Sequence, residues 1–339
     1  MSKKNSSVIL KNEFKNFKDL SHLYLNFKNK LKKFKVKSSI IAISGGPDSL
    51  ALAALTKAYC KNNKGKFFYV LVNHNIRKNS DKEAYQVKDL LKKYKISLKI
   101  LTNKKIINKN IQGEARKIRY ELLTKFCIKK KVKTIITAHN FEDQVETFFI
   151  RLSRGSGLTG LSAMKPLINL NQKVKLFRPL LDTKKVKLKK LSKIVFGKYF
   201  SDPSNKDKKY LRTRIRHLKK PLIQSGISYD NIFKSINNLA SSKRTLDEYF
   251  SKIYKATIIK VKNKIFIDLN DFIKYNPEIK LMIINESIKR MTNNYYHPRS
   301  KKVFNLIKNI ETLQIDSATL GGCLFSINKG TICIKKEKK

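Results

Sequence analysis

Cysteines, acidic residues and long apolar runs are all scarce in this 339-residue chain. Its 4 cysteines form no Cys-x-x-Cys pair, which argues against a disulfide framework, a four-cysteine zinc site or an iron–sulfur site. No apolar run reaches the roughly eighteen residues of a membrane span, and the first ten residues lack the apolar core of a signal peptide. We therefore expect a cytoplasmic protein that makes no membrane contact. The hydrophobic share of 41% is enough for a packed core.

The shortage of acids leaves a formal net charge of +52, from 76 Lys and Arg against 24 Asp and Glu. Such a charge attracts polyanions, because bound counterions are released when a nucleic acid binds. A coding bias toward Lys, Asn and Ile would also raise the charge, so composition alone leaves both explanations open.

Arginine is rare beside lysine, 12 against 64, and nine of the arginines lie between residues 77 and 216. Where lysine is the usual base, arginine should persist mainly where a planar, bidentate guanidinium is needed, as for phosphates and carboxylates. The clustering predicts a site built from this middle stretch. Ordinary surface salt bridges are the alternative, and they would not need to cluster.

Short apolar runs alternate with helical stretches from about residue 38, which predicts a parallel sheet. We expect an α/β fold with a five-stranded parallel sheet covered by helices on both faces. The predicted strands lie at 39–44, 67–73, 97–101, 134–138 and 174–181. The predicted helices between and after them lie at 49–60, 81–94, 114–130, 143–152, 183–199 and 209–224, with an irregular loop at 153–173.

Three regions follow from the change of pattern along the chain. Residues 1–37 are predicted to form a basic helical arm, 38–225 the α/β domain, and 226–339 a smaller, mainly helical C-terminal domain with a short β element. The helices of this last domain are expected at 228–254, 277–292 and 300–311, the β pair at 256–269 and a hairpin at 319–335.

The strongest motif is Ser44-Gly45-Gly46-Pro47-Asp48-Ser49, between the first predicted strand and a helix. Its glycines allow a sharp turn and close approach of a ligand, and the helix start offers free N–H groups and a positive dipole end to an anion. Its serines add hydroxyl donors. Asp48 would repel bare phosphate, so we expect Mg²⁺ between this carboxylate and a pyrophosphate group. A plain strand–turn–helix junction with Asp48 or Ser49 as the helix cap is the alternative.

Two motifs place cations near this turn. His74 and Arg77 follow the second predicted strand, and ligands of parallel sheets bind beyond the carboxyl ends of the strands. Arg116 and Arg119 share one face of a predicted helix with Tyr120, which suits a phosphate or a carboxylate. A hydrogen-bonded loop histidine and a solvated basic face are the respective alternatives.

An acidic cluster follows the fourth predicted strand. His139, Asp143 and Glu146 lie at i, i+4 and i+7, so they share a face if the helix starts early. Acids at a helix N-terminus are stabilising in themselves, which is the plain explanation. Beside a nucleotide, such a cluster could bind Mg²⁺, deprotonate a nucleophile or hold an ammonium group.

Six arginines flank a glycine loop or lie on a later helix, as RNA-backbone contacts would: Arg151, Arg154, Arg178, Arg212, Arg214 and Arg216.

Taken in order, these motifs resemble the tRNA(Ile)-lysidine synthase family. Ser-Gly-Gly-x-Asp-Ser is similar to the PP-loop of ATP pyrophosphatases, which have the adenine nucleotide alpha hydrolase-like fold, and it is neither a Walker A loop nor Gly-x-Gly-x-x-Gly. It is followed by Asn-His-x-Ile-Arg, Glu-Ala-Arg-x-x-Arg-Tyr, Thr-Ala-His…Asp-Gln-x-Glu-Thr, Arg-Pro-Leu-Leu and Asp-x-Ser-Asn…Arg-x-x-Ile-Arg. The match covers about residues 39–220, and the remainder resembles the family's smaller tRNA-binding region only loosely.

The resemblance implies that ATP adenylates the C2 oxygen of the wobble cytidine in tRNA(Ile) with anticodon CAU, after which free L-lysine displaces AMP. It implies ATP binding by Ser44–Ser49, His74 and Arg77, Mg²⁺ at Asp48, and catalysis by Asp48, His139 and Asp143. Lysine would be bound by Glu146, Arg116 and Arg119, and tRNA by Arg151, Arg154, Arg178, Arg212, Arg214 and Arg216. An attacking amine must be neutral, which suits a nearby carboxylate.

The chain departs from the family pattern at four positions. Asn73 stands where the family has Asp, and Asn140 stands where it has His. Glu142 stands where the family has Asp, and Thr213 stands where it has Asn. The nearest alternative is a PP-loop tRNA thiolase, which commonly uses cysteine pairs that this chain lacks. A small-molecule amide synthetase would explain the glycine turn but not the clustered arginines. A non-catalytic RNA-binding protein would leave the acidic cluster without a purpose.

Overall fold

The structure is a computed structural model that describes residues 18–77, 79–107, 111–201, 207, 209–292, 298–314 and 317–337. The segment between the predicted helices at 183–199 and 209–224 and the first part of the predicted N-terminal arm lie largely outside these residues. The chain divides into two compact units, Met1–Ala240 and Ser241–Lys339. The division falls inside helix α11 (Tyr229–Thr257), further along the chain than the expected boundary near residue 225.

The first unit is built on a six-stranded sheet with the order β3-β2-β1-β4-β6-β5. Every neighbouring pair is parallel except β5 with β6. The five predicted strands are confirmed, and the short antiparallel β5 adds a strand inside the predicted loop. The strands are β1 (Ser39–Ile43), β2 (Phe67–Asn73), β3 (Leu98–Thr102), β4 (Thr134–Ile136), β5 (Leu167–Asn169) and β6 (Lys175–Phe177).

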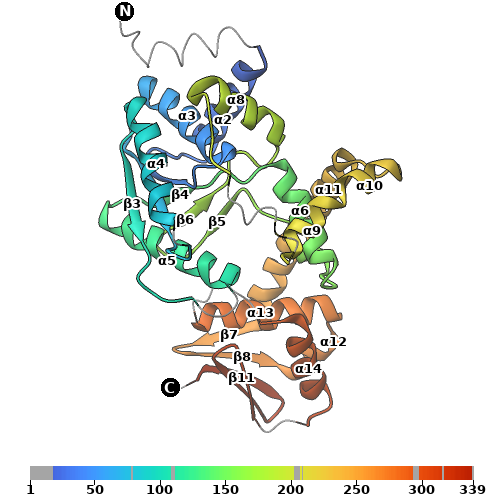
Figure 1. Ribbon diagram of the computed structural model, residues 1–339. Helices are drawn as coiled ribbons and strands as arrows, with labels where there is room; N and C mark the ends of the chain where they lie inside the picture. The colour runs from blue at the N-terminus through green and yellow to red at the C-terminus, as the bar shows by residue number, and fades with distance from the viewer. Residues whose placement is uncertain are drawn as a thin grey trace, which may run out of the picture. The chain divides into compact units, whose positions relative to one another are not determined.

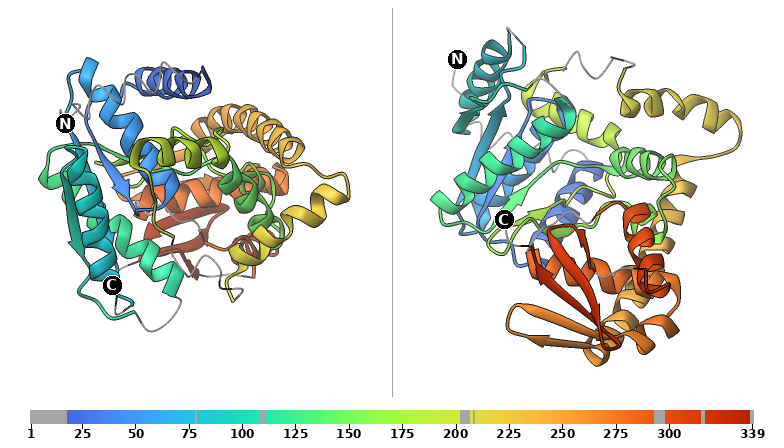
Figure 2. Two further views of the ribbon diagram at one scale, coloured as in Figure 1. Left: turned by 45° about the horizontal axis from the view of Figure 1, so that its top comes forward. Right: turned by 90° about the horizontal axis from the view of Figure 1, so that it is seen from below.

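Helices cover both faces of this sheet, as Figures 1 and 2 show. Strand residues alternate between the two cores: Ile41 packs with one, while its neighbour Ile40 packs with the other. Four helices contribute to the first core: α2 (Lys18–Lys33), α3 (Pro47–Asn62), α4 (Ser80–Lys93) and α8 (Lys185–Phe196). Helix α5 (Ile111–Lys129) packs on the opposite face.

Helix α2 comes from the predicted basic arm and belongs to the core of the first unit. Leu20, Leu23, Phe27 and Leu31 recur every three or four residues, and all are buried. Its lysines remain on the other faces. The arm is therefore, over these residues, a structural layer against α3 and α8.

Four more helices surround the carboxyl ends of the strands. They are α6 (Phe141–Leu152), α7 (Leu158–Leu161), α9 (Leu211–His217) and α10 (Lys219–Gln224). Helix α6 packs against α9 and α7. A small core joins α6 to the start of α11 through Phe141, Val145, Ile232 and Ile236.

The second unit holds a five-stranded antiparallel sheet with the order β7-β8-β11-β10-β9, more extensive than the expected short β element. Its strands are β7 (Ile258–Val261), β8 (Lys264–Asp268), β9 (Ser317–Leu320), β10 (Cys323–Asn328) and β11 (Thr331–Lys336). Its helices are α12 (Leu269–Lys274), α13 (Pro277–Thr292) and α14 (Ser300–Glu311). No helix among the described residues is long and apolar enough to cross a membrane.

Candidate active site

The glycine turn joins β1 to α3 and its shape is fixed by contacts on both sides. Gly45 has φ +82°, and a Cβ there would lie 2.5 Å from Cγ2 of Val87. The N–H of Phe200 donates to the Gly45 carbonyl at 3.0 Å. Only glycine satisfies both the backbone angle and the close approach.

The start of α3 keeps its N–H groups free of side-chain caps. Gly46 is the extended N-cap residue, with no side-chain cap bond, and Pro47 opens the helix. The Ser49 hydroxyl points back into the turn, accepting from the Ser44 N–H at 3.1 Å and donating to the Gly46 carbonyl at 3.0 Å. Neither Ser49 nor Asp48 acts as a helix cap, so the turn presents the anion-binding end of a helix.

The acidic cluster begins where β4 ends. Asn140 caps α6: its side-chain oxygen accepts from the Asp143 N–H at 3.0 Å, and the Asp143 carboxylate accepts from the Asn140 N–H at 3.1 Å. This capping box fixes Asp143 at the helix start. Glu142 accepts from the Lys185 N–H at 2.8 Å, which ties α6 to the start of α8.

The two loops meet because β1 and β4 are neighbours, where the strand order turns from β3-β2-β1 to β4-β6. Loops at such a reversal form the usual ligand site of an open α/β sheet. The pKa of Asp48 is raised from 3.8 to about 6, mainly by burial; Lys185 and a hydrogen bond from Asn140 oppose the rise, and the carboxylates of Asp143 and Glu142 add to it. The Lys185 Nζ lies 4.0 Å from Asp48. Asp48 and Asp143 are therefore close enough for the charge of Asp143 to affect the pKa of Asp48.

His139 sits in the same region and is neutral there. Its Nδ1 lies 2.8 Å from the hydroxyl of Thr137. Burial lowers its pKa; Asp143 opposes this, while Arg178, Arg116 and Arg212 lower the pKa further. A neutral imidazole can accept or relay a proton but adds no fixed charge.

Glu146 is engaged by two arginines of α9. It is only 3% exposed, with Arg216 Nε at 2.7 Å from Oε1 and Arg216 Nη2 at 3.1 Å from Oε2. The Nε of Arg212 lies 3.0 Å from Oε2. Burial raises the pKa of Glu146, and the Arg216 hydrogen bonds counteract that rise. Arg216 is also close enough to Asp143 and Asp48 for both carboxylates to raise its own pKa.

The remaining predicted residues divide into paired and exposed groups. Arg119 lies 3.4 Å from Nε2 of His74, and burial together with this arginine lowers the pKa of His74 to about 4. Arg77 pairs with Glu83 of α4 at 2.8 Å. Arg119 therefore contacts His74, and Arg77 contacts a side chain of α4.

The predicted RNA contacts are not all at the surface. Arg178 is buried and donates to the Lys165 carbonyl at 2.8 Å. Arg151 donates to the carbonyls of Gly160 and Ala163 at 2.6 and 2.7 Å, closing the loop that holds α7. Of the six arginines predicted to contact RNA, two are exposed, Arg154 and Arg214. A sequence cannot separate these groups, because the carbonyl partners come from other segments.

The donor set at Asp48 fits a divalent cation shared with a nucleotide. Asp48 Oδ1 is buried and has no hydrogen-bond partner among the described residues. No cluster of three or more His, Cys, Asp or Glu side chains suited to a metal occurs in the described ranges. Mg²⁺ commonly takes one or two carboxylates and completes its shell with phosphate oxygens and water. Asp48 would be the protein's contribution to such a site.

The strand order, the glycine turn and the facing carboxylates define a PP-loop nucleotide-binding protein. Residues 20–222 match the family model described as a PP-loop domain. A solved U34-tRNA thiolase from Methanococcus maripaludis has the same fold, with a TM-score of 0.53 and 20% identity over 63% of this chain and 78% of that one.

The relatives narrow this class. The tRNA(Ile)-lysidine synthase of Wolbachia pipientis is 35% identical over 290 residues, which cover 84% of this chain and 67% of that protein. The enzyme of the same name from Orientia tsutsugamushi is 33% identical over 309 residues, covering 88% and 69%. The chain belongs to the tRNA(Ile)-lysidine synthase family.

Proposed function

We propose that this protein attaches L-lysine to C2 of the wobble cytidine of tRNA(Ile) with anticodon CAU. The cytidine O2 attacks the α-phosphorus of ATP and pyrophosphate leaves; the lysine amine then attacks C2, AMP leaves and the amine loses a proton. The product is lysidine, and a tRNA substrate would be met in the cytoplasm. The observation that carries the proposal is the parallel pairing of β1 with β4, which brings the glycine turn with Asp48 and the start of α6 with Asp143 to the same ends of neighbouring strands.

The glycine turn would bind the phosphates of ATP. Its extended Gly46 leaves the first N–H groups of α3 uncapped, and the helix dipole adds partial positive charge there. Bound Mg²⁺ would neutralise phosphate charge and hold the pyrophosphate leaving group. Asp48 would hold that ion, because its buried Oδ1 lacks a hydrogen-bond partner in the described structure.

Asp143 would receive the proton of the attacking amine. One of its oxygens is used in the capping box, so the helix fixes the carboxylate in place while it remains partly exposed. His139, whose imidazole is neutral and half-buried, would relay a proton or accept a hydrogen bond beside Asp143. A positioned carboxylate typically contributes about 10²–10⁴-fold to such a proton transfer.

Glu146 remains our proposed partner for the lysine ammonium group, but it must first be released. Both of its oxygens are occupied by the α9 arginines in this structure. Arg116, exposed on α5 and stacked over Tyr120 at 5.0 Å, would be available for the lysine carboxylate. Its lowering effect on the pKa of His139 supports this role.

The test is the incubation of the protein with ATP, labelled lysine and total tRNA. We expect label in a single tRNA, with release of AMP and pyrophosphate. Asp48→Ala and Asp143→Ala should abolish incorporation while leaving tRNA binding within about twofold, because neither residue is a cationic contact. Asp89→Ala, at an exposed position of α4, is the matched control and should retain activity.

Two outcomes would count against the proposal. Label that spreads over many tRNAs, or none in any tRNA while AMP is still formed, would exclude lysine transfer to one wobble base. Sulfur transfer in place of lysine would favour the thiolase alternative, although the four cysteines lie outside both site loops.

A further inference from the structure

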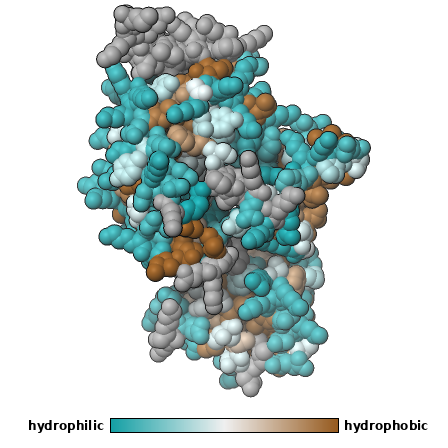
Figure 3. Space-filling model, viewed as in Figure 1, coloured by the Kyte–Doolittle hydropathy of each residue, from teal (hydrophilic) through white to brown (hydrophobic). Residues whose placement is uncertain are grey.

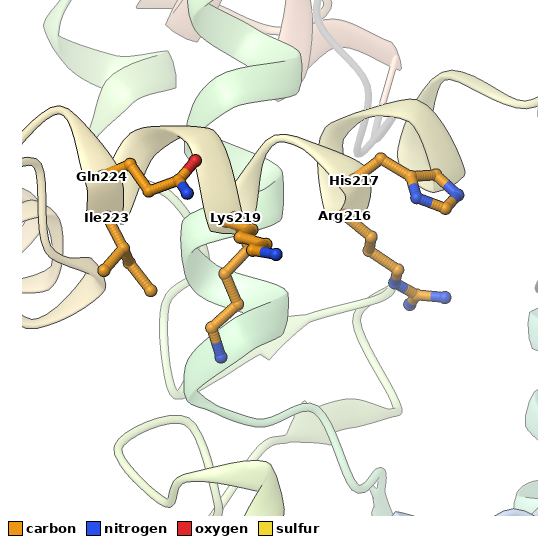
Figure 4. A pocket seen from close by; sticks show the side chains of 6 residues that line it. Arg216, His217, Lys219, Ile223 and Gln224 are labelled. Atoms are coloured by element: carbon orange, nitrogen blue, oxygen red, sulfur yellow. The ribbon is translucent and has the colours of Figure 1, made fainter.

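A pocket on α9 and α10 lies beside the acidic cluster and has no role in the reaction described above. It has a volume of about 540 Å³, the size range of sites for a single small ligand. Figure 4 shows Arg216, Lys219 and Ile223 extending to the same side of the two helices. Its lining residues are Arg216, His217, Lys219, Lys220, Ile223 and Gln224.

The charged side chains that line this pocket are all basic. Residues 209–224 contain seven basic side chains, counting His217, and no acid. In a protein with 24 acidic residues, two acids contact the lining side chains from α6: Glu146, 2.7 Å from the Arg216 Nε, and Glu142, 3.9 Å from the Lys219 Nζ. The pocket is therefore suited to an anion.

The two α9 arginines Arg212 and Arg216, which the sequence predicts to contact RNA, already contact a carboxylate of the protein itself. Arg216 makes a bidentate contact with Glu146, and Arg212 contacts the same carboxylate. The cations left for an external anion are on the next turn: Lys219 and Lys220 are exposed, as is His217. The Lys219 ammonium also lies 5.0 Å from the ring of Tyr229, which holds it near the pocket.

One wall of the pocket is apolar although it is exposed. Ile223 is 53% exposed, and two more large apolar side chains close by in sequence, Leu218 and Ile227, are 46% and 45% exposed. Figure 3 shows apolar surface amid hydrophilic surface at the tip that carries α10. A lysine pair beside an exposed aliphatic surface matches a nucleotide, whose phosphate is charged and whose base and ribose are largely apolar on their faces.

We propose that the α9–α10 pocket binds one nucleotide of the substrate RNA, next to the base that is modified. Lys219, Lys220 and His217 hold its phosphate, and Ile223 contacts its base or ribose. This rests on the proposed function and assigns the RNA contact to α10, whereas Arg212 and Arg216 serve Glu146. Since Arg216 belongs to both the pocket and the acidic cluster, the bound nucleotide adjoins the reaction centre.

The experiment compares Lys219→Gln/Lys220→Gln with wild type, using fluorescently labelled tRNA and the full chain. We expect the Kd for tRNA to rise about tenfold or more at moderate salt, and the slope of log K against log salt to fall by about one to two. The KM for tRNA should rise likewise, while kcat at saturating tRNA and the KM for ATP stay within about twofold. Arg216→Gln should instead lower kcat with little change in the Kd for tRNA.

The matched control is Lys92→Gln/Lys93→Gln, an exposed lysine pair in the last turn of α4. Helix α4 follows the carboxyl end of β2, so its last turn lies toward the amino ends of the strands. Because the pocket lysines are surface residues, we expect the double variant to fold. If it unfolds, Lys220→Glu alone is compared with wild type in the same tRNA-binding assays. An unchanged Kd and salt slope in the pocket variants, or a loss equal to that of the control, would overturn the proposal. Tight, pocket-dependent tRNA binding without lysine transfer would keep the pocket and refute the proposed function instead.

Discussion

Substitution of Asp48 by Asn should stabilise the protein while it abolishes activity. The pKa of this carboxyl rises from 3.8 to about 6 in the folded state, mainly because of burial. A raised acid pKa means that ionisation opposes folding, so the free energy of unfolding falls as pH increases from about 4 to 6. The full effect corresponds to about 3 kcal/mol above pH 7. Asn keeps the size of the side chain and removes the buried charge, so it should recover most of this energy.

Thermal unfolding of wild type and Asp48→Asn at pH 5 and pH 7.5 measures the effect. For a unit of this size, about 3 kcal/mol corresponds to an increase in Tm on the order of 5–10 °C at pH 7.5. At pH 5 the advantage should shrink to about half, since the wild-type carboxyl is then mostly protonated. Asp89→Asn, at an exposed position, should show no such gain. An equal difference at both pH values, or a destabilised variant at pH 7.5, would refute the burial argument.

The other predictions test the turn, the buried acid and a histidine. Gly45→Ala should lose at least about 2 kcal/mol of stability and ATP binding in thermal melts, whereas Gly226→Ala, with the same φ of +82° but open space around it, should lose only about 1 kcal/mol. Glu146→Gln should lower the unfolding free energy by about 2–3 kcal/mol in denaturant titrations, because two arginines lose their partner; an unchanged midpoint would contradict this. The pKa of His74, lowered to about 4, means that stability declines as pH falls from 6.5 toward 4; Arg119→Gln should raise that pKa in an NMR titration, and no movement would remove Arg119 as a cause.

The strands and the nucleotide turn could be predicted from local pattern. Each parallel strand is an apolar run bounded by polar residues, and the turn combines two glycines with a following helix. Strand β5 was missed because three residues, Leu167–Asn169, carry no periodicity, and they become a strand only by pairing with β6. The extent of the second sheet was underestimated for a similar reason, since β8 pairs with β11 across more than sixty residues of chain.

The internal contacts of the candidate site could not be predicted as well as the strands that carry it. That the loops with Asp48 and Asp143 lie at the same ends of the strands follows from the parallel pairing of β1 with β4, while the roles of the two residues stay predictions. The engagement of Glu146 by α9 could not be predicted, because it joins residues about seventy positions apart. The capping role of Asn140 had a local signal, Asn followed by an acid three positions later, which was overlooked because Asn140 was considered only as a replacement for a titrating residue.

The pairing of β1 with β4 has a consequence for synthesis on the ribosome. Ile40 can pair with Ile135 of β4 only after Ile135 has been translated. Its partner in β2, Phe68, is translated much earlier. The glycine turn therefore leaves the exit tunnel long before the acids that face it, and Arg216 follows later still. A nascent chain halted before α9 would lack both arginines that engage Glu146, so the acidic cluster reaches its final charge balance only late in synthesis.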